Sequence, residues 1–250
     1  MLAALIGISL LFPQLIDSTK TLSKPVPSAA EITAEKRGDI FVARKMYREA
    51  VDSYQQALRE FPRDARLYNK LGISYHRQEM FGQARRSYEE ASRLDAKYSE
   101  AINNLGTIYF AERRYKKAQR TYEKALKLTP DSAAVYSNLG TALFARRRYK
   151  QATAIYMKAL ELDPSVFENG GRGGTTLQDR SVEERGKYYY YLAQAFAENG
   201  HYVRSVIYLR RSIEEGYGKA KRADQDPAFK AMYELPDFLA IMNPETAAVR

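Results

Sequence analysis

The stretch that decides the fold is Leu105-Gly106-Thr107-Ile108-Tyr109, followed at set intervals by Ala118, Tyr122, Ala125 and Pro130. The same pattern returns every 34 residues, both before and after this stretch. The glycines of the series are Gly38, Gly72, Gly106 and Gly140, and the first alanines are Ala50, Ala84, Ala118 and Ala152. A fixed period of this size is typical of a repeat array, in which each unit packs on its neighbours. The chain is therefore interpreted as consecutive copies of one unit.

Each unit has the spacing of two antiparallel helices joined by a short polar turn. In the third unit, Ile102, Leu105 and Tyr109 recur at three- and four-residue steps, which places them on one face of a first helix. The second run repeats these steps and ends where a proline removes the N–H that a continuing helix needs. The prolines concerned are Pro62, Pro130 and Pro164, and the predicted N-caps of following helices include Asp64 and Ser132. The predicted unit is a helix hairpin.

Small residues mark where helices approach closely, and aromatic residues fill the space beside them. Gly106 and Ala118 fall where the two helices of a hairpin meet, and Ala125 falls where the next unit packs. Tyr115 and Tyr122 lie in the layer between the helices. We interpret most of the 20 tyrosines as packing residues, and not as a platform on which bases stack.

The units resemble tetratricopeptide repeats, which have a period of 34 and the same order of small and aromatic residues. The third unit matches that pattern in full, at Ile102, Leu105, Gly106, Tyr109, Ala118, Tyr122, Ala125 and Pro130. The second unit carries Ala96 in place of the proline, the fourth carries Leu143 in place of an aromatic residue, and the first departs at Arg37. The resemblance covers residues 31–164. It implies an all-α fold, a right-handed α-solenoid of about five helix hairpins with C-terminal capping helices.

Beyond Pro164 the period breaks and then resumes. The run Gly170-Gly171-Arg172-Gly173-Gly174 is too rich in glycine to stay helical, and Ser181-Val182-Glu183-Glu184 has the form of a capping box that opens a fifth unit. The insert lacks a Walker pattern and a preceding strand, so a surface loop is favoured over a phosphate loop or an RNA contact. Two proline-led short helices, around Phe229 and Phe238, are expected to cover the last unit.

The predicted organisation has five parts. They are a hydrophobic signal or anchor segment at 1–16, a linker at 17–30, the repeat array at 31–219, a C-terminal cap at 220–242 and a tail at 243–250. Within the array, repeats are expected near 31–64, 65–98, 99–132, 133–166 and 186–219, with the Gly-rich insert at 167–185.

The N-terminal segment is predicted to direct export or membrane association. Leu2–Ile16 is apolar apart from Ser9 and Gln14. As a helix it would reach ~22 Å, short of the ~30 Å hydrocarbon core, whereas its core has the length of a signal-peptide h-region. However, no Lys or Arg precedes it. A cytoplasmic protein with an apolar arm packed on the first repeat, or a misplaced start codon, stays open as the alternative.

Composition excludes several kinds of site. The chain has no cysteine, which excludes a disulfide framework, a thiolate nucleophile and a Cys-based zinc site. The two histidines, His76 and His201, belong to no spaced metal-ligand cluster, and no acid–base pair or nucleophile arrangement stands out. We therefore predict no cofactor, no metal and no enzymatic activity. The net charge of +10 favours an acidic protein surface, nucleic acid or anionic lipid as partner.

First helices line the concave side in this family, so the resemblance implies a partner-binding groove there. The predicted groove residues are Asn69, Ile73, His76, Asn103, Asn104, Thr107, Phe110, Asn138, Thr141, Phe144, Tyr190, Tyr191 and Gln194. An asparagine amide offers a donor and an acceptor to a peptide main chain, and the aromatic residues suit a partner helix or an extended apolar peptide. The alternative is that the asparagines tie neighbouring helices together.

A clamp for the acidic C-terminal tails of chaperones is not expected. Family members with that activity use Lys, Asn and Arg at set groove positions. The matching places here hold Asn69, Ile73, Asn104, Ala134 and Asn138, so only one residue fits.

Basic residues recur at the turn between paired helices. The predicted basic edge consists of Arg113, Arg114, Lys117, Arg146, Arg147 and Arg148. Such an edge can bind an anionic membrane surface, nucleic acid or an acidic protein, or it can serve only as a solubilising rim.

The favoured hypothesis is a non-catalytic scaffold or adaptor that binds a peptide or helix of a protein partner in the concave groove. The alternative is binding of nucleic acid or an anionic surface through the basic inter-helix turns, with nucleic acid the less favoured partner.

Overall fold

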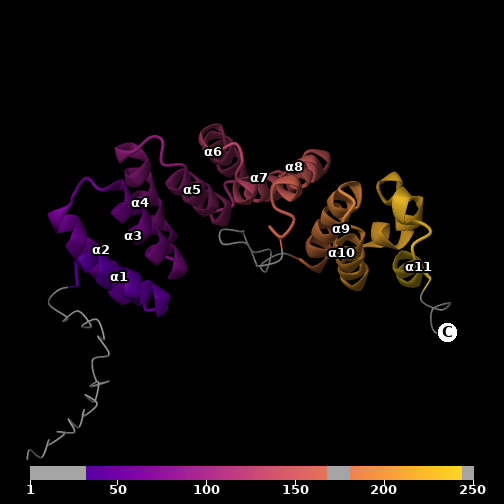
Figure 1. Cartoon of the computed structure of the whole chain (residues 1–250), viewed down its shortest axis with the longest axis horizontal. Helices are drawn as coiled ribbons and strands as arrows, with labels where there is room; N and C mark the ends of the chain where they lie inside the picture. Colours follow the sequence, from indigo (N-terminus) through magenta and orange to yellow (C-terminus); the bar gives the residue numbers. More distant parts are fainter. Residues whose placement is uncertain (1–31, 168–180, 244–250) are drawn as a thin grey trace, which may run out of the picture. The chain divides into compact units, whose positions relative to one another are not determined.

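The computed structural model describes residues 32–167 and 181–243 (Figure 1). The chain divides into a unit of Met1–Thr33 and a unit of Ala34–Arg250, and the repeats belong to the second. The described residues contain helices and no strand, which confirms the all-α class. The predicted signal or anchor segment at 1–16, the linker at 17–30 and the glycine run of the insert lie outside the described residues, as does the tail beyond residue 243.

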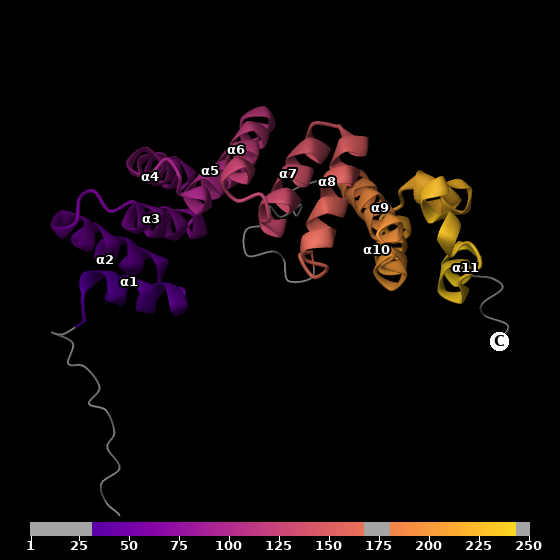
Figure 2. The ribbon, with the colours of Figure 1, turned by 45° about the horizontal axis from the view of Figure 1, so that its top comes forward.

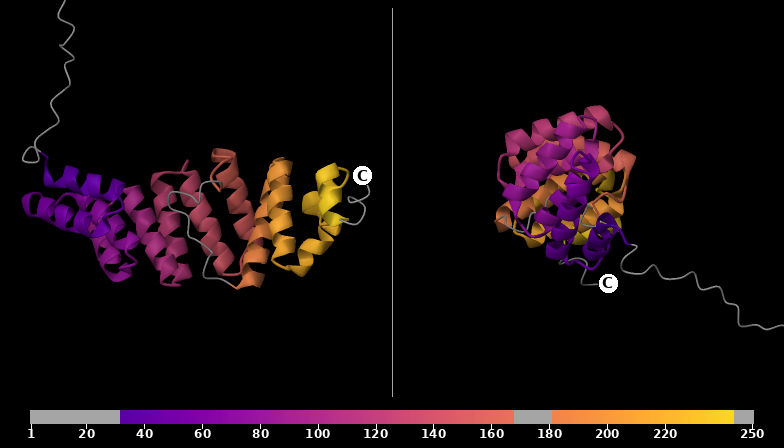
Figure 3. Two further views of the ribbon diagram at one scale, coloured as in Figure 1. Left: turned by 90° about the horizontal axis from the view of Figure 1, so that it is seen from below. Right: turned by 90° about the vertical axis from the view of Figure 1, so that its left-hand side faces the viewer.

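Five helix hairpins follow one another along the described part of the second unit (Figure 2). Their helices are α1 (Ala34–Ala43) and α2 (Tyr47–Glu60), α3 (Ala65–Arg77) and α4 (Phe81–Leu94), α5 (Ser99–Ala111) and α6 (Tyr115–Leu128), α7 (Ala133–Ala145) and α8 (Tyr149–Leu162), and α9 (Val182–Glu198) and α10 (Tyr202–Glu214). The second helices of the first four hairpins also pack on the first helix of the next hairpin, and α10 packs on the C-terminal segment (Figure 3). This arrangement confirms the predicted α-solenoid. Among the described residues, no helix has both the length and the apolar character needed to cross a membrane.

The repeating glycine is required by a tyrosine ring of the same hairpin. A Cβ atom added to Gly106 would lie 2.5 Å from Cε1 of Tyr122, far inside van der Waals contact. The other three repeats of the 34-residue series have the same pair, with distances of 2.4 to 2.6 Å. In the fifth hairpin the corresponding positions hold Ala193 and Leu209, both fully buried. There the larger Ala193 replaces the glycine and the smaller Leu209 replaces the tyrosine, so the space between the two helices stays filled.

The helix ends follow the predicted caps. Asp64 accepts hydrogen bonds from the N–H groups of Arg66 and Leu67, and Ser132 accepts one from the N–H of Val135. Ser181 Oγ accepts from the N–H of Glu184 at 3.2 Å, so the predicted capping box does open α9. α9 begins at Val182, ahead of residue 186 where the fifth repeat is expected to start, and is therefore longer than the other first helices.

The turn inside each hairpin holds one residue in the left-handed region. These residues are Lys45, Glu79, Arg113 and Arg147, with φ between 58° and 61°, and Gly200, with φ of 75°. An L-residue with a Cβ pays a steric cost in this conformation, whereas glycine does not. Four of the five turns therefore carry strain that a glycine would remove.

The C-terminal segment covers the last hairpin with a 3₁₀ helix η1 (Gly218–Gln225), a 3₁₀ helix η2 (Pro227–Met232) and α11 (Pro236–Met242). Phe229 and Phe238 are buried and share a core cluster with Leu209. The two proline-led helices are as predicted, whereas η1 was not. Asp226, between η1 and η2, accepts hydrogen bonds from Tyr190 Oη and Gln194 Nε2 and so joins the cap to α9.

Candidate partner-binding surface

The asparagines of the first helices form a ladder within the protein. Asn104 Nδ2 donates to Asn69 Oδ1 at 3.0 Å, and Asn138 Nδ2 donates to Asn103 Oδ1 at 3.0 Å. These bonds connect α3 with α5 and α5 with α7, so each joins two successive hairpins. Asn69 also donates to Tyr98 Oη and Glu100 Oε1. The asparagines therefore tie neighbouring helices together, the alternative that the sequence left open.

The predicted aromatic centre of the groove is buried. Phe110 and Phe144 are 7% and 3% exposed, and each packs against the tyrosine that begins the next helix, with ring centres 5.1 and 5.3 Å apart. Tyr190 is fully buried and donates its hydroxyl to Asp226. These three rings cannot supply the exposed apolar surface that the sequence predicts, because aromatic side chains of adjacent helices cover them.

Three further predicted groove residues are buried and bonded within the protein. Thr107 and Thr141 accept hydrogen bonds from the hydroxyls of Tyr122 and Tyr156, at 3.3 and 3.4 Å. Gln194 donates to Asp226 at 2.9 Å. Their positions were assigned correctly to first helices, but the side chains stabilise hairpins and the cap.

Five predicted groove residues keep partly exposed side chains, namely Ile73, His76, Asn103, Asn104 and Tyr191. His76 packs against Phe81 with ring centres 6.0 Å apart. Burial, together with the positive charge of Arg77, lowers the pKa of His76, which favours its neutral form. The surface available to a partner along the first helices is therefore narrower than predicted.

Ile73 lines a small pocket of about 180 Å³ with Val42, Asp39, Tyr54 and Lys70. We call it the Ile73 pocket. Its polar groups already satisfy one another, since Tyr54 Oη donates to Asp39 at 2.8 Å and Lys70 Nζ pairs with Asp39 at 2.8 Å. Burial and the hydrogen bond to Asp39 raise the pKa of Tyr54, so its hydroxyl keeps its proton. A side chain that enters this pocket meets mainly apolar walls.

The predicted basic edge is partly neutralised. Arg114 pairs with Glu112 at 3.1 Å and lies over the ring of Tyr109, as does Lys117. Arg146 donates to a glutamine of α6, and Arg148 donates to Gln151 at 3.4 Å. Arg113 and Arg147 occupy the left-handed turn positions and are exposed. Of the six predicted residues, these two have the freest charges.

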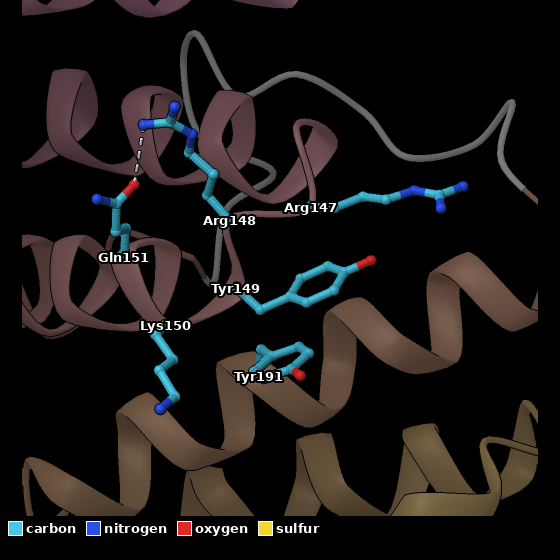
Figure 4. A pocket seen from close by; sticks show the side chains of 6 residues that line it. All are labelled: Arg147, Arg148, Tyr149, Lys150, Gln151 and Tyr191. Carbon is cyan, nitrogen blue, oxygen red and sulfur yellow. Dashed lines mark hydrogen bonds between the residues drawn. The ribbon is translucent and has the colours of Figure 1, made fainter.

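Members of both predicted sets line one open pocket of about 510 Å³ between α8 and α9 (Figure 4). We call it the Tyr149 pocket, and its lining residues are Arg147, Arg148, Tyr149, Lys150, Gln151 and Tyr191. The rings of Tyr149 and Tyr191 are stacked, with centres 4.8 Å apart and planes inclined by 8°. Lys187 Nζ lies 4.6 Å from the centre of the Tyr149 ring.

The sequence missed Tyr149 and Lys187 as candidate site residues. Tyr149 falls on a repeat position that predicts packing, and its stacked partner Tyr191 follows the insert, outside the 34-residue series. The available signal was the density of basic residues around Tyr149. Within the described ranges, residues 32–167 and 181–243, no group of three or more His, Asp or Glu residues is arranged to hold a metal ion.

Family models match three stretches of the chain. Two are described as tetratricopeptide repeat, at residues 98–165 and 65–98, and one as TPR repeat, at residues 38–79. No curated protein sequence matches the chain significantly.

Several solved structures have a similar fold. MamA is 21% identical, with 75% of this chain and 96% of that chain covered and a TM-score of 0.52. MamA from Desulfovibrio magneticus RS-1, from residue 41 to its end, is 16% identical, with 77% and 95% covered and a TM-score of 0.53. YrrB, a TPR protein with an unusual peptide-binding site, is 17% identical, with 77% and 90% covered and a TM-score of 0.51. At these identities the likeness is one of fold.

Proposed function

Because the chain belongs to the tetratricopeptide repeat family, whose matches together span residues 38–165, we propose that it is a non-catalytic scaffold that binds a protein partner. The proposal rests on the observation that the residues of the repeat pattern are consumed by packing within the array. The small and aromatic positions of the pattern are buried in packing, as at Gly106, Ala118 and Tyr122. Specific contacts are then left to the partly exposed residues between them.

The finer part of the proposal places an extended segment of the partner along the first helices. Asn103 and Asn104 belong to the ladder but are partly exposed, and the atoms that the ladder bonds leave over, Asn103 Nδ2 and Asn104 Oδ1, offer a donor and an acceptor to a main chain. An apolar side chain of the segment enters the Ile73 pocket, whose polar groups are already paired. The peptide-binding site of YrrB is consistent with such use of this fold.

Affinity capture from native cells tests the proposal, with the full chain as bait and an Ile73→Asp variant beside it. We expect the unchanged chain to retain a reproducible set of proteins and the variant to lose them, because a hydrated carboxylate at position 73 replaces the apolar wall that would receive the partner's side chain. Val203→Asp is the matched control, since Val203 is 69% exposed on α10 and lines neither pocket. Circular dichroism checks that both variants stay helical. Equal capture by both variants would contradict the finer proposal.

The same experiment addresses the alternative of nucleic acid. If the retained material were nucleic acid, binding through six phosphate contacts would weaken with a salt slope of about −5 for duplex DNA. Replacing Arg146, Arg147 and Arg148 with alanine would then abolish retention. Retention of protein that is insensitive to nuclease supports the scaffold.

We further propose that residues 1–16 direct export or membrane association, on the strength of their apolar run. Fractionation of cells and sequencing of the mature N-terminus test this. A chain found only in the cytoplasm with residues 1–16 intact would contradict it.

A further inference from the structure

The geometry of the Tyr149 pocket points to a recognition site for an acidic peptide. We propose that this pocket binds carboxylate side chains of an Asp- or Glu-rich segment in the protein partner. The inference rests on the proposed scaffold function and names the chemistry of one contact. The site lies at the turn between α7 and α8 and on the side of α9, apart from the asparagine ladder.

The guanidinium of Arg147 is accessible to a ligand, and its backbone lies in the left-handed region. Its φ is 61°, and the equivalent turn of the fifth hairpin holds Gly200, which adopts a similar φ without a steric cost. The side chain is exposed, and no hydrogen bond or ion pair is recorded for it among the described residues. The turns of the first three hairpins hold Lys45, Glu79 and Arg113 in the same conformation, so the strain belongs to the repeat, and Arg147 differs from them by its place in the pocket. Here the side chain extends along the pocket beside Tyr149 (Figure 4).

Among the described residues, the charged side chains that line the pocket are all basic, and the carboxylate of Asp226 acts on Tyr191 from outside the lining. Arg148 and Lys150 line it with Arg147, and Lys187 adds a fourth cation against the Tyr149 ring. Among residues 32–167 and 181–243, no carboxylate lines the pocket. Its four cations therefore favour an anionic ligand, with a strength that falls as salt screens the charges.

The aromatic wall favours carboxylates over nucleic-acid bases. Single-stranded nucleic acid is bound by stacking its bases on free aromatic faces. Tyr149 and Tyr191 stack on each other at 4.8 Å, so no base can enter between them. The tyrosine hydroxyls are left as hydrogen-bond donors, and an arginine guanidinium matches the two oxygens of a carboxylate. Burial raises the pKa of Tyr191, which keeps its hydroxyl protonated and able to donate.

A turn variant tests the site without a risk of misfolding. Arg147→Gly removes the guanidinium and relieves the strained φ. Lys45→Gly also removes an exposed cation from a left-handed turn position, with φ of 60° in the first hairpin and outside both pockets, and is the matched control. Fluorescence anisotropy with the full chain measures binding of a labelled Glu-rich peptide, and of the same peptide with Gln in place of Glu.

We expect the Glu peptide to bind. The Gln peptide should bind at least about tenfold more weakly, because its amides cannot make the charge-assisted hydrogen bonds of a carboxylate. Arg147→Gly should weaken binding of the Glu peptide about tenfold, and Lys45→Gly should leave it within about twofold of the unchanged chain. Equal binding of both peptides, or equal effects of both variants, would overturn the proposal. So would a single-stranded oligonucleotide that binds more tightly than the Glu peptide and depends on Arg147.

The outcomes separate this inference from the scaffold function. Loss of partner capture in Ile73→Asp without binding of the Glu peptide would refute the acidic site alone. Absence of any captured protein would refute the scaffold, whatever the peptide does.

Discussion

Replacing Gly106 with alanine puts a methyl group where the structure leaves no room. The added Cβ would lie 2.5 Å from Tyr122 Cε1, and the Tyr122 ring is fully buried and bonded through its hydroxyl to Thr107. Overpacking of this kind costs about 1–3 kcal/mol. Alanine gains about 1 kcal/mol over glycine in helix propensity, which offsets part of the cost. We expect Gly106→Ala to lower the free energy of unfolding by up to about 2 kcal/mol, and Tm by about 2–4 °C for each kcal/mol lost.

Urea and thermal unfolding followed by circular dichroism measure the effect. Gly82→Ala is the control, because a Cβ at Gly82 meets nothing within 4 Å, so this variant should be as stable as the unchanged chain or more so. Adding Tyr122→Leu to Gly106→Ala should recover part of the loss, since it recreates the pair Ala193 and Leu209 of the fifth hairpin. If Gly106→Ala matched Gly82→Ala in stability, the role assigned to the repeating glycine would be wrong.

Three further predictions concern other parts of the fold. Arg113→Gly should raise the free energy of unfolding in urea titration by up to about 1 kcal/mol, because glycine has no Cβ to clash at a φ of 59°. A lower free energy of unfolding would show that the turn is unstrained. Asn103→Ala should lower the free energy of unfolding by about 1–3 kcal/mol, because Asn138 Nδ2 loses its buried acceptor. An unchanged midpoint of urea unfolding would contradict the role given to the ladder. Burial by itself would raise the pKa of Asp226, but hydrogen bonds from Tyr190 and neighbouring groups hold it below the usual value. A lowered folded pKa contributes stability above the unfolded pKa that is lost as pH falls through the folded one, so Tm should drop below about pH 4, and less in Asp226→Asn. Parallel pH profiles of the two chains would refute this.

Much of the fold was predictable because the repeat pattern is local and strict. The period places Gly106 and Tyr122 in one hairpin, and side-chain volume then requires that one be small when the other is large. Asp64 and Ser181 mark helix starts through hydrogen bonds to the next few N–H groups, which depend only on nearby sequence. Features set within one unit were therefore accessible from the sequence.

The candidate site was less predictable because exposure depends on the neighbouring unit. The repeat register gives the face on which Phe110 and Phe144 lie, but not the rings that cover them. Phe144 is covered from outside its own hairpin by Tyr188 and Tyr191, which follow the insert. The Tyr149 pocket arises at the same junction, where the 34-residue series no longer fixes which residues meet.

Site-specific photo-crosslinking tests the central claim, that exposed residues around the first helices and the Tyr149 pocket bind a protein partner. A photoreactive residue is placed at Ile73, at Lys150 on the pocket rim, or at Arg120, an exposed residue of α6 that lines neither pocket. Irradiation of cells that express each full chain is followed by separation of the adducts by mass. We predict discrete protein adducts from positions 73 and 150 and none from position 120. The same adducts from all three positions, or none from 73 and 150, would contradict the claim.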